Sequence, residues 1–247
     1  MPWTSLVTPS ARHISPERLD DLEPNDPRAQ RSRRDLQRVH RAMGSLTILK
    51  HAIRTSMGRA QPRTILELGA GDGSLLLRLA RTLRPQWTGV QLTLLDRHNL
   101  VSDQTRAAFS RLGWSVSTLC ADVNEWARLP SEKYYDFCCA TLFLHHFDSF
   151  ELQCLLSHIA ARTKAFIACE PRRCGLARIG SYLVGCLGAN EVTREDAVKS
   201  VAAGFDGFEI GALWPNPDCS WLIDEYAARP FTHCFVATRA HPGNSLT

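Results

Sequence analysis

The chain has 247 residues, of which 44% are hydrophobic, and its formal net charge is +4. This length suits one large domain, or one domain with an appendage, and the hydrophobic fraction is enough for a sizeable core. The charge is too small to indicate nucleic-acid binding by itself, and no apolar run approaches the roughly 20 residues of a membrane helix. We therefore expect a globular protein without a membrane span.

Nine cysteines are scattered along the chain, and no two of them form a C-x-x-C pair. An odd number without the spacing of a disulfide framework is typical of reduced thiols and argues against a structural zinc site. The first residues also lack the apolar core of a secretory signal. The sequence therefore predicts a cytoplasmic protein with no bound metal.

The N-terminal part of the chain falls into two segments. Residues 1–27 are rich in Pro, Ser and Asp, which predicts a poorly ordered arm with a short helix near residues 16–22. Residues 28–58 have helical periodicity, and Gly44 is expected to divide them into two helices that form a lid. The arginines between residues 28 and 41 fit a solvated helix face, a lid over an anionic ligand, or contact with RNA or a membrane.

The middle of the chain alternates between short apolar runs and amphipathic stretches. Strands are predicted at residues 65–68, 90–95, 115–119, 135–140 and 165–169, with helices between them at 74–81, 102–112, 124–129 and 148–161. This alternation predicts an α/β fold, in which a parallel sheet carries helices on both faces.

The last third of the chain has a different pattern. It predicts an apolar helix packed against protein on most sides, a second helix, a possible short strand and a terminal β-hairpin, at residues 176–187, 193–203, 208–213 and 220–238. The tail at residues 241–247 is expected to add nothing to the fold.

A glycine-rich turn follows the first strand of the middle region. The strand carries Glu67, the turn contains Gly69, Ala70 and Gly71, and a helix begins at Ser74. A strand, a glycine turn and a helix bring backbone N–H groups close to a nucleotide-type ligand, because glycine tolerates a positive φ and carries no side chain. Taken alone, such a turn would also fit NAD, FAD or a phosphate.

Acidic residues follow the next strands and narrow the choice of ligand. Asp96 ends the second strand, where a carboxylate can accept hydrogen bonds from a ribose diol. Asp122 ends the third and can accept from the amine of an adenine. Asp72 lies in the glycine turn itself, where it would repel a phosphate, and Ser74 stands where a dinucleotide motif has its third glycine. These positions favour an adenosine that carries positive charge.

These motifs together resemble the class I S-adenosylmethionine-dependent methyltransferases. The resemblance rests on the stretches ILELGAGDGS, LTLLD, CADV, YYDFCCATLFLHHF and ACEPRR, and it covers roughly residues 60–240. It implies a Rossmann-like seven-stranded sheet with an antiparallel last strand in a domain at residues 59–240, with S-adenosyl-L-methionine as cofactor. The cofactor-binding residues that it implies are Glu67, Gly69, Ala70, Gly71, Asp96, Arg97, Asp122, Val123 and Thr141.

The YYDFCCATLFLHHF and ACEPRR stretches are similar to the small-molecule branch of that family. The N-terminal helical segment and the late tail are similar to bacterial methyltransferases of aromatic polyketide-type metabolites. The resemblance thus implies a small-molecule methyl acceptor, with O-methylation favoured. The alternatives are an RNA methyltransferase that uses the Arg-rich segment, and a catalytically silent methyltransferase-like binding protein.

Methyl transfer from a sulfonium is an in-line displacement that gains most from positioning and needs no metal. A phenol or carboxylic acid acceptor must lose a proton, and histidine suits that task near neutral pH. His145 and His146 follow the fourth strand, and at most one of them is expected to face the acceptor, with His146 favoured. Equally, both could be structural. Glu170 is expected to pair with an arginine or to contact substrate.

Apolar residues outside the predicted sheet are candidates for the wall of the acceptor pocket. These residues are Tyr182, Leu183, Leu187, Phe205 and Trp214. They would favour an aromatic or lipid-like acceptor, although the same residues could instead complete the hydrophobic core.

Overall fold

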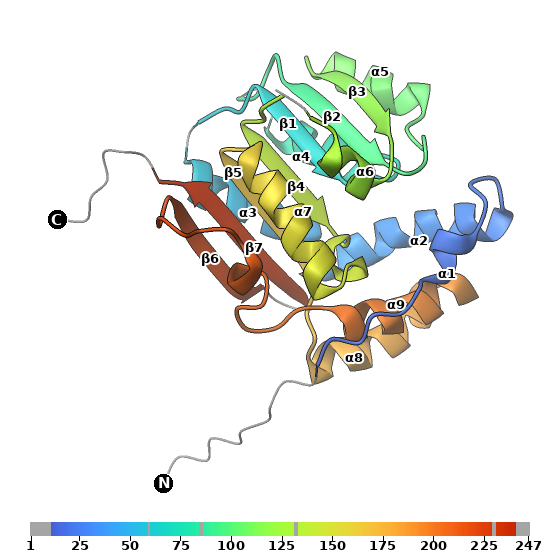
Figure 1. Cartoon of the computed structure of the whole chain (residues 1–247). Helices are drawn as coiled ribbons and strands as arrows, with labels where there is room; N and C mark the ends of the chain where they lie inside the picture. Colours follow the sequence, from blue (N-terminus) through green and yellow to red (C-terminus); the bar gives the residue numbers. More distant parts are fainter. Residues whose placement is uncertain (1–10, 59, 84–85, 131–132, 229–230, 241–247) are drawn as a thin grey trace, which may run out of the picture.

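A single seven-stranded sheet organises the part of the chain that the computed structural model describes, residues 11–58, 60–83, 86–130, 133–228 and 231–240 (Figure 1). The strands are β1 Thr64–Leu68, β2 Gln91–Asp96, β3 Ser115–Cys120, β4 Phe137–Thr141, β5 Ala165–Pro171, β6 Trp221–Ala228 and β7 Thr232–Arg239. Their order is β3-β2-β1-β4-β5-β7-β6. The pairs among β1 to β5 are parallel, and β7 runs antiparallel to both β5 and β6. The predicted fold, including its antiparallel last strand, is confirmed.

Helices cover both faces of the sheet. In Figure 1, α6 (Val123–Arg128) and α7 (Ser149–Ala161) lie in front of it, and α3 (Ser45–Met57) and α4 (Ser74–Leu83) lie behind it. The side chains of β1 alternate between the two faces, so Ile65 packs in one apolar cluster and Leu66 in the other. Each face therefore has its own core, as expected for a sheet buried on both sides.

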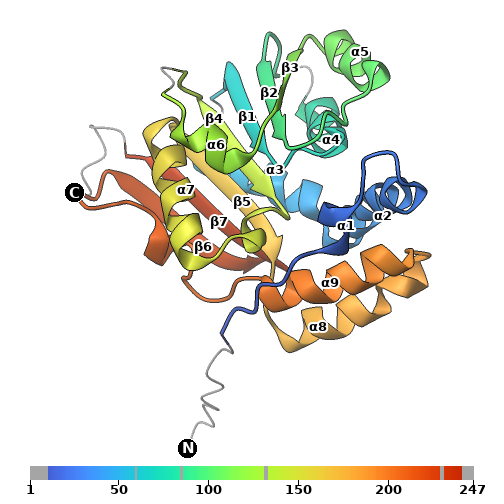
Figure 2. The ribbon, with the colours of Figure 1, turned by 45° about the vertical axis from the view of Figure 1, so that its right-hand side comes forward.

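A third group of helices lies beyond the carboxyl ends of the parallel strands. It contains α1 (Arg18–Asp21), α2 (Pro27–Met43), α8 (Gly175–Tyr182) and α9 (Glu191–Ala203), which Figure 2 shows stacked at one end of the sheet. Helix α5 (Asp103–Arg111) flanks the sheet near β3, and three 3-10 turns complete the elements: η1 Leu144–His146, η2 Leu183–Leu187 and η3 Gly211–Leu213. Ligands of open α/β sheets bind at this end.

The ends of several helices follow from local sequence signals. Asp148 and Glu151 form the predicted capping box of α7, in which each side chain accepts the other residue's backbone N–H. Gly44 has φ +70 and separates α2 from α3, so the predicted break in the N-terminal helical segment is present.

Two expectations for the last third are wrong. Residues 208–213 form no strand, because the buried Glu225 carboxylate accepts the N–H groups of Ile210 at 3.0 Å and Gly211 at 2.7 Å and holds them in a turn. The apolar stretch 176–187 is α-helical to Tyr182 and continues as the 3-10 turn η2, and it does not face protein on most sides. Leu176 is 61% exposed and Ile179 60%, because the stretch packs on α9 along one side alone.

The first described residues do not form the poorly ordered arm that composition predicts. Residues 11–26 run along α9 and then turn into α2, with the predicted short helix present as α1 (Figure 2). Their polar groups are paired: Asp196 of α9 accepts the backbone N–H groups of Arg18 at 2.8 Å and Leu19 at 3.0 Å. Residues 1–10, and the predicted tail at 241–247, lie outside the described residues. Among the described helices, none is long and apolar enough to span a membrane.

Candidate active site

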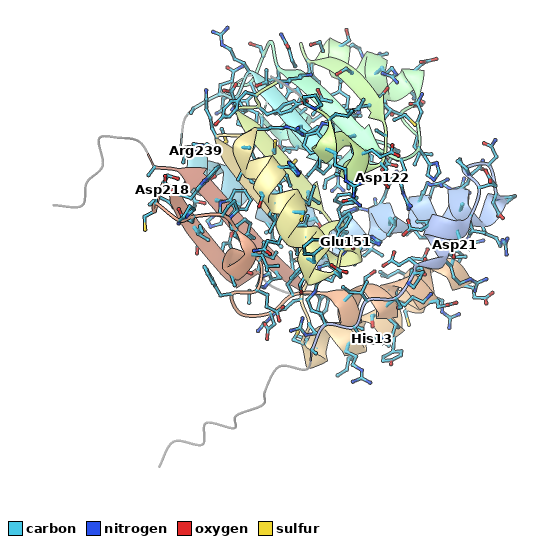
Figure 3. All side chains as sticks on the ribbon, in the orientation of Figure 1. His13, Asp21, Asp122, Glu151, Asp218 and Arg239 are labelled. Carbon is cyan, nitrogen blue, oxygen red and sulfur yellow. The ribbon has the colours of Figure 1, made fainter. Side chains whose placement is uncertain are left out.

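A cavity of about 510 Å³ lies at the carboxyl ends of the strands, between the sheet, α2 and residues 14–20. Its size is within the range of small-molecule and cofactor sites. The structure brings every site residue that the sequence predicts to the wall of this one cavity: Glu67, Gly69, Ala70, Gly71, Asp96, Arg97, Asp122, Val123, Thr141, His145 and His146. Figure 3 marks Asp122 at the start of α6 and Glu151 in the first turn of α7, two of the acids in this wall.

The glycine turn after β1 has the backbone that the sequence predicts. Gly69 has φ +65 and Gly71 has φ +55, both in the left-handed region that favours glycine. A Cβ atom at Gly69 would overlap the ring of Phe143. Any residue larger than glycine at position 69 would therefore clash with Phe143, which lies in the loop after β4.

Asp96 and Asp122 fix the loops around the cavity. The two carboxylate oxygens of Asp96 accept the backbone N–H groups of Gly71 at 2.8 Å and His98 at 3.0 Å. Asp122 caps α6 by accepting the N–H of Asn124 at 2.8 Å. Each carboxylate oxygen has two acceptor sites, so these bonds leave capacity for a ligand.

Two buried oxygen atoms in the cavity wall have no hydrogen-bond partner among the described residues. They are Glu67 Oε2 and Thr141 Oγ1. Burial, together with the nearby charges of Asp72 and Asp96, raises the pKa of Glu67 well above its usual range. An unpartnered buried carboxyl is costly, so this site fits a ligand that brings hydrogen-bond donors and positive charge.

Acids dominate the charges in the cavity wall: Glu17, Asp20, Glu67, Asp72, Asp96, Asp122 and Glu151. Two arginines also line it, and both are engaged. Arg97 forms an ion pair with Asp20 at 2.9 Å, and Arg33 donates to the carbonyl of Pro24 at 2.8 Å. This distribution of charge disfavours a phosphate and favours a cationic or zwitterionic guest.

Helix α2 contacts the glycine turn through one side-chain hydrogen bond. Asp72 accepts the backbone N–H of Ser74 at 3.0 Å and the side-chain amide of Gln37 at 2.7 Å. The other contacts of α2 are internal to the protein, as shown by Arg38, which pairs with Asp35 at 2.6 Å. The helix thus covers the cavity through a neutral amide, while most of its arginines are exposed.

His145 is buried between two carboxylates. Its Nδ1 lies 2.8 Å from Glu170 Oε2, and its Nε2 lies 3.3 Å from Glu17 Oε1. Burial by itself would lower the pKa of His145, but the hydrogen bonds to Glu17 and Glu170 outweigh it and raise the pKa to about 9. The imidazole is therefore protonated at neutral pH and cannot accept a further proton.

Glu170 has a different partner from the arginine or substrate that the sequence suggests. Its carboxylate accepts the N–H groups of Phe143 at 3.0 Å and Leu144 at 2.9 Å as well as that of His145. The two following arginines pair elsewhere, Arg172 with Asp206 at 3.1 Å and Arg173 with Glu209 at 2.6 Å. Glu170 thus holds the η1 turn, and it is absent from the cavity wall.

His146 is the member of the pair that is partly exposed, with 27% of its side chain accessible. Its Nδ1 lies 3.5 Å from Asp20 Oδ2, and its ring centroid lies 4.3 Å from that of His145. Burial, followed by the positive charge of His145, lowers the pKa of His146. A neutral imidazole at the cavity wall can accept a proton. Of the two adjacent histidines, His145 is therefore the charged one and His146 the neutral one.

Glu17, Asp20 and His40 are among the residues of the cavity wall that sequence reasoning missed. Glu17 and Asp20 lie in a segment whose composition predicts disorder, and no local pattern signals their position. His40 has a weak signal, because it follows Leu36 by one helical turn and Leu36 also lines the cavity. Burial, with the positive charge of Arg78, lowers the pKa of His40 to about 4, so it is a second neutral imidazole in the wall.

Glu17, His145 and His146 also have the residue types of a metal site, with one donor atom from each within 4.8 Å of the others. Both nitrogens of His145 already face carboxylate oxygens. A proton on each nitrogen completes these contacts, so the cluster is accounted for by hydrogen bonds.

The predicted wall of the acceptor pocket is wrong. Phe205 and Trp214 are buried in the core, and Tyr182, Leu183 and Leu187 are exposed, so none of the five lines the cavity. The reason is that α8 and η2 lie on the far side of α9. Apolar residues from other elements line it instead: Ile14, Leu19, Leu36, Leu100, Phe143 and Phe147.

Residues 65–165 match the model of a family described as "Methyltransferase domain". No curated protein sequence matches the chain significantly. Among solved structures, the plantazolicin methyltransferase BpumL in complex with SAH is similar, with a TM-score of 0.60, 14% identity, and coverage of 87% of this chain and 92% of that one.

Two further solved structures share the fold. An O-methyltransferase family protein from Burkholderia thailandensis has a TM-score of 0.59 at 16% identity, with 88% of this chain and 61% of that chain covered. Magnesium protoporphyrin IX methyltransferase from Synechocystis has a TM-score of 0.53 at 15% identity, with 84% and 86% covered. The predicted resemblance is confirmed at the level of the fold: the chain has the class I methyltransferase fold, and its residues 65–165 match the methyltransferase-domain model.

Proposed function

We propose, on the premise that residues 65–165 form a methyltransferase domain, that the chain transfers a methyl group from S-adenosyl-L-methionine to a small aromatic or polyketide-derived acceptor. The observation that carries the proposal is the acid-lined cavity at the glycine turn, with its two unpartnered buried oxygen atoms. O-methylation is the favoured reaction.

The residues of the wall fit this cofactor. Asp96 and Asp122 are placed at the carboxyl ends of adjacent strands, where a ribose diol and an adenine amine can donate to them. Glu67 offers the unpartnered carboxyl oxygen that an ammonium group can satisfy. The structures of BpumL and of the protoporphyrin methyltransferase were solved with SAH bound, which supports the same class of ligand here.

When bound, S-adenosylmethionine supplies an electrophilic methyl group on a sulfonium. The protein's part is to hold the acceptor oxygen in line with that methyl and to exclude water. His146 is neutral and lines the cavity, and in this proposal one of its ring nitrogens takes the hydroxyl proton of the acceptor as the oxygen attacks. Charged His145 does not exchange protons but holds the turn on which His146 sits.

The chemistry of the remaining wall supports a hydroxylated aromatic acceptor. Apolar side chains from residues 14–20, α2 and the β4 loop suit a flat apolar body, and the neutral His40 and His146 offer polar contacts without charge. An RNA acceptor is less well supported, because acids dominate the cavity wall and Arg31, Arg33 and Arg38 of α2 contact groups of the protein itself.

The test is methyl transfer from S-adenosyl-L-[methyl-³H]methionine to a panel of phenols, aromatic carboxylic acids and aromatic amines. We expect turnover with phenols and a product that is stable to mild base, as an aryl ether is. Labelled product from amines alone would contradict O-methylation. Binding of the cofactor without transfer to any member of the panel or to a metabolite extract would favour the silent binding protein.

A further inference from the structure

Residues 11–21, here called the N-terminal strap, cross the mouth of the cavity. Six of them line it, from Ile14 to Asp20 with the exception of Arg18. At its far end the strap reaches the loop after β2, where Asp20 pairs with Arg97 at 2.9 Å. A cofactor enclosed behind these residues is therefore covered by the strap.

The strap is seated on α9 by several independent contacts. Asp196 accepts two of its backbone N–H groups, as described above, and His13, marked in Figure 3, donates its backbone N–H to Ala202 at 3.0 Å. The Arg12 guanidinium donates to the carbonyl of Ala203 at 2.8 Å and lies 4.1 Å from the ring centroid of Phe205. These contacts specify one seat for the strap.

The seat brings Glu17 to the buried side of the strap. Its Oε1 lies 3.3 Å from His145 Nε2, and the hydroxyl of Ser200 donates to the same oxygen. His145 in turn contacts Glu170 of β5. The row Glu17–His145–Glu170 thus joins three elements: the strap, η1 and β5.

The row also affects the orientation of the His146 ring, because His146 follows His145 directly in the chain. Because each ring nitrogen of His145 faces a carboxylate oxygen, the ring can rotate only by breaking a charge-assisted hydrogen bond. The His146 ring packs on it with centroids 4.3 Å apart. The charged groups that face the pair are Glu17 and Asp20 from the strap, Glu170 from β5, and the Arg12 guanidinium, which donates to the carbonyl of His145 at 3.3 Å.

We propose that Glu17 is a positioning residue for methyl transfer: closure of the N-terminal strap brings its carboxylate onto His145, and this contact fixes His146 toward the acceptor. The inference rests on the proposed function, since it assigns a role within that reaction. It adds that the site is complete only when the strap is seated, so acceptor and cofactor must enter before the strap closes.

The test compares Glu17→Gln, which keeps the size of the side chain, with Glu23→Gln, which changes an exposed carboxylate just beyond the strap. We expect kcat of Glu17→Gln to fall by about 10- to 100-fold, the scale of a misplaced reacting group, while the Kd for SAH changes less than about 3-fold. We expect Glu23→Gln to behave as wild type. An unchanged kcat in Glu17→Gln would overturn the proposal.

The pH profile separates positioning from a merely structural role. Glu17 raises the pKa of His146 through its own charge and lowers it by holding the positive charge on His145, so the acidic limb of kcat/KM should move in Glu17→Gln. A lower melting temperature with an unmoved limb would contradict the proposal. Asp196→Asn, which loosens the strap without touching the row, should reproduce part of the loss in kcat.

A readout without turnover keeps this test distinct from that of the proposed function. In ¹⁵N-histidine-labelled wild-type protein, we expect the imidazole of His145 to remain protonated on both nitrogens at pH 8, and Glu17→Gln to abolish that signal. Its persistence in the variant would refute the Glu17 contact even if no acceptor were found. One equivalent of Zn²⁺ retained by wild type and lost in Glu17→Gln would also overturn the proposal, because Glu17 would then be a metal ligand.

Discussion

Replacement of Glu170 by glutamine is the sharpest perturbation of the buried row. The wild-type carboxylate accepts hydrogen bonds from two backbone N–H groups and from protonated His145. A glutamine keeps one accepting oxygen but turns an NH₂ group toward either the backbone donors or the imidazole. Glu170→Gln therefore places two donors against each other and leaves His145 with a single carboxylate.

The expected cost is large because the pair is fully buried. Removing one partner of a buried ion pair typically destabilises a protein by about 3–5 kcal/mol. Part of this depends on pH. The folded pKa of His145, about 9, lies above its unfolded value of 6.5, so the row stabilises fully below pH 6.5 and this contribution, on the order of 3 kcal/mol, is lost as pH rises through 9.

Urea unfolding at pH 6 and at pH 10, in reducing buffer because of the free cysteines, measures both quantities. We expect Glu170→Gln to be less stable by about 3–5 kcal/mol at pH 6 and the gap to narrow at pH 10. The control is Glu195→Gln, which removes exposed ion pairs to Arg18 and Lys199 and should leave the stability close to that of wild type, because solvent screens exposed ion pairs. Equal stability of wild type and Glu170→Gln at pH 6, or a gap that does not change with pH, would refute the reasoning.

Three further predictions concern the glycine turn, a helix end and His146, the proposed base. Gly69→Ala should weaken cofactor binding at least tenfold in calorimetry, because its Cβ overlaps the Phe143 ring and its φ is positive; unchanged affinity would contradict this. Asp148→Ala breaks the capping box with Glu151 and should lower stability by about 0.5–2 kcal/mol in urea unfolding; unchanged stability would contradict the role of the cap. Activity on a phenol should fall at low pH with a midpoint below 6.5, since the pKa of His146 is lowered, and a wild-type rate in His146→Ala would remove it as the base.

The core of the fold could be predicted because its signals are local. The apolar run of β1, the glycine turn and the amphipathic α4 follow one another within 20 residues, and each has its own periodicity. The parallel arrangement then places the acids that end the strands at one edge, so Asp96 and Asp122 could be assigned to the site from their positions alone.

The surroundings of the site could not be predicted, because they depend on contacts between distant parts of the chain. Glu17 meets His145 across 128 residues. Glu170 stands next to two arginines in the sequence, yet its partner is His145, because Arg172 and Arg173 reach other acids. Proximity in sequence does not identify the ion-pair partner of Glu170, because the chain turns sharply after β5.

The late helices illustrate the limit of apolar patterns. The stretch 176–187 is hydrophobic, which predicts burial, but α8 has a partner on one side only, and Leu176 and Ile179 are exposed. A pattern indicates which residues can be buried, and only the packing of the whole chain decides which of them are.

Calorimetric titration of S-adenosyl-L-methionine into the wild-type protein and into Asp96→Ala tests the central claim most directly. We expect one equivalent to bind to wild type, and the variant to lose about 1.5–3 kcal/mol of binding free energy, a roughly 10- to 100-fold weaker Kd, through loss of the proposed ribose contact and of the bond to Gly71. No binding to wild type, or equal affinity in the two proteins, would contradict the account.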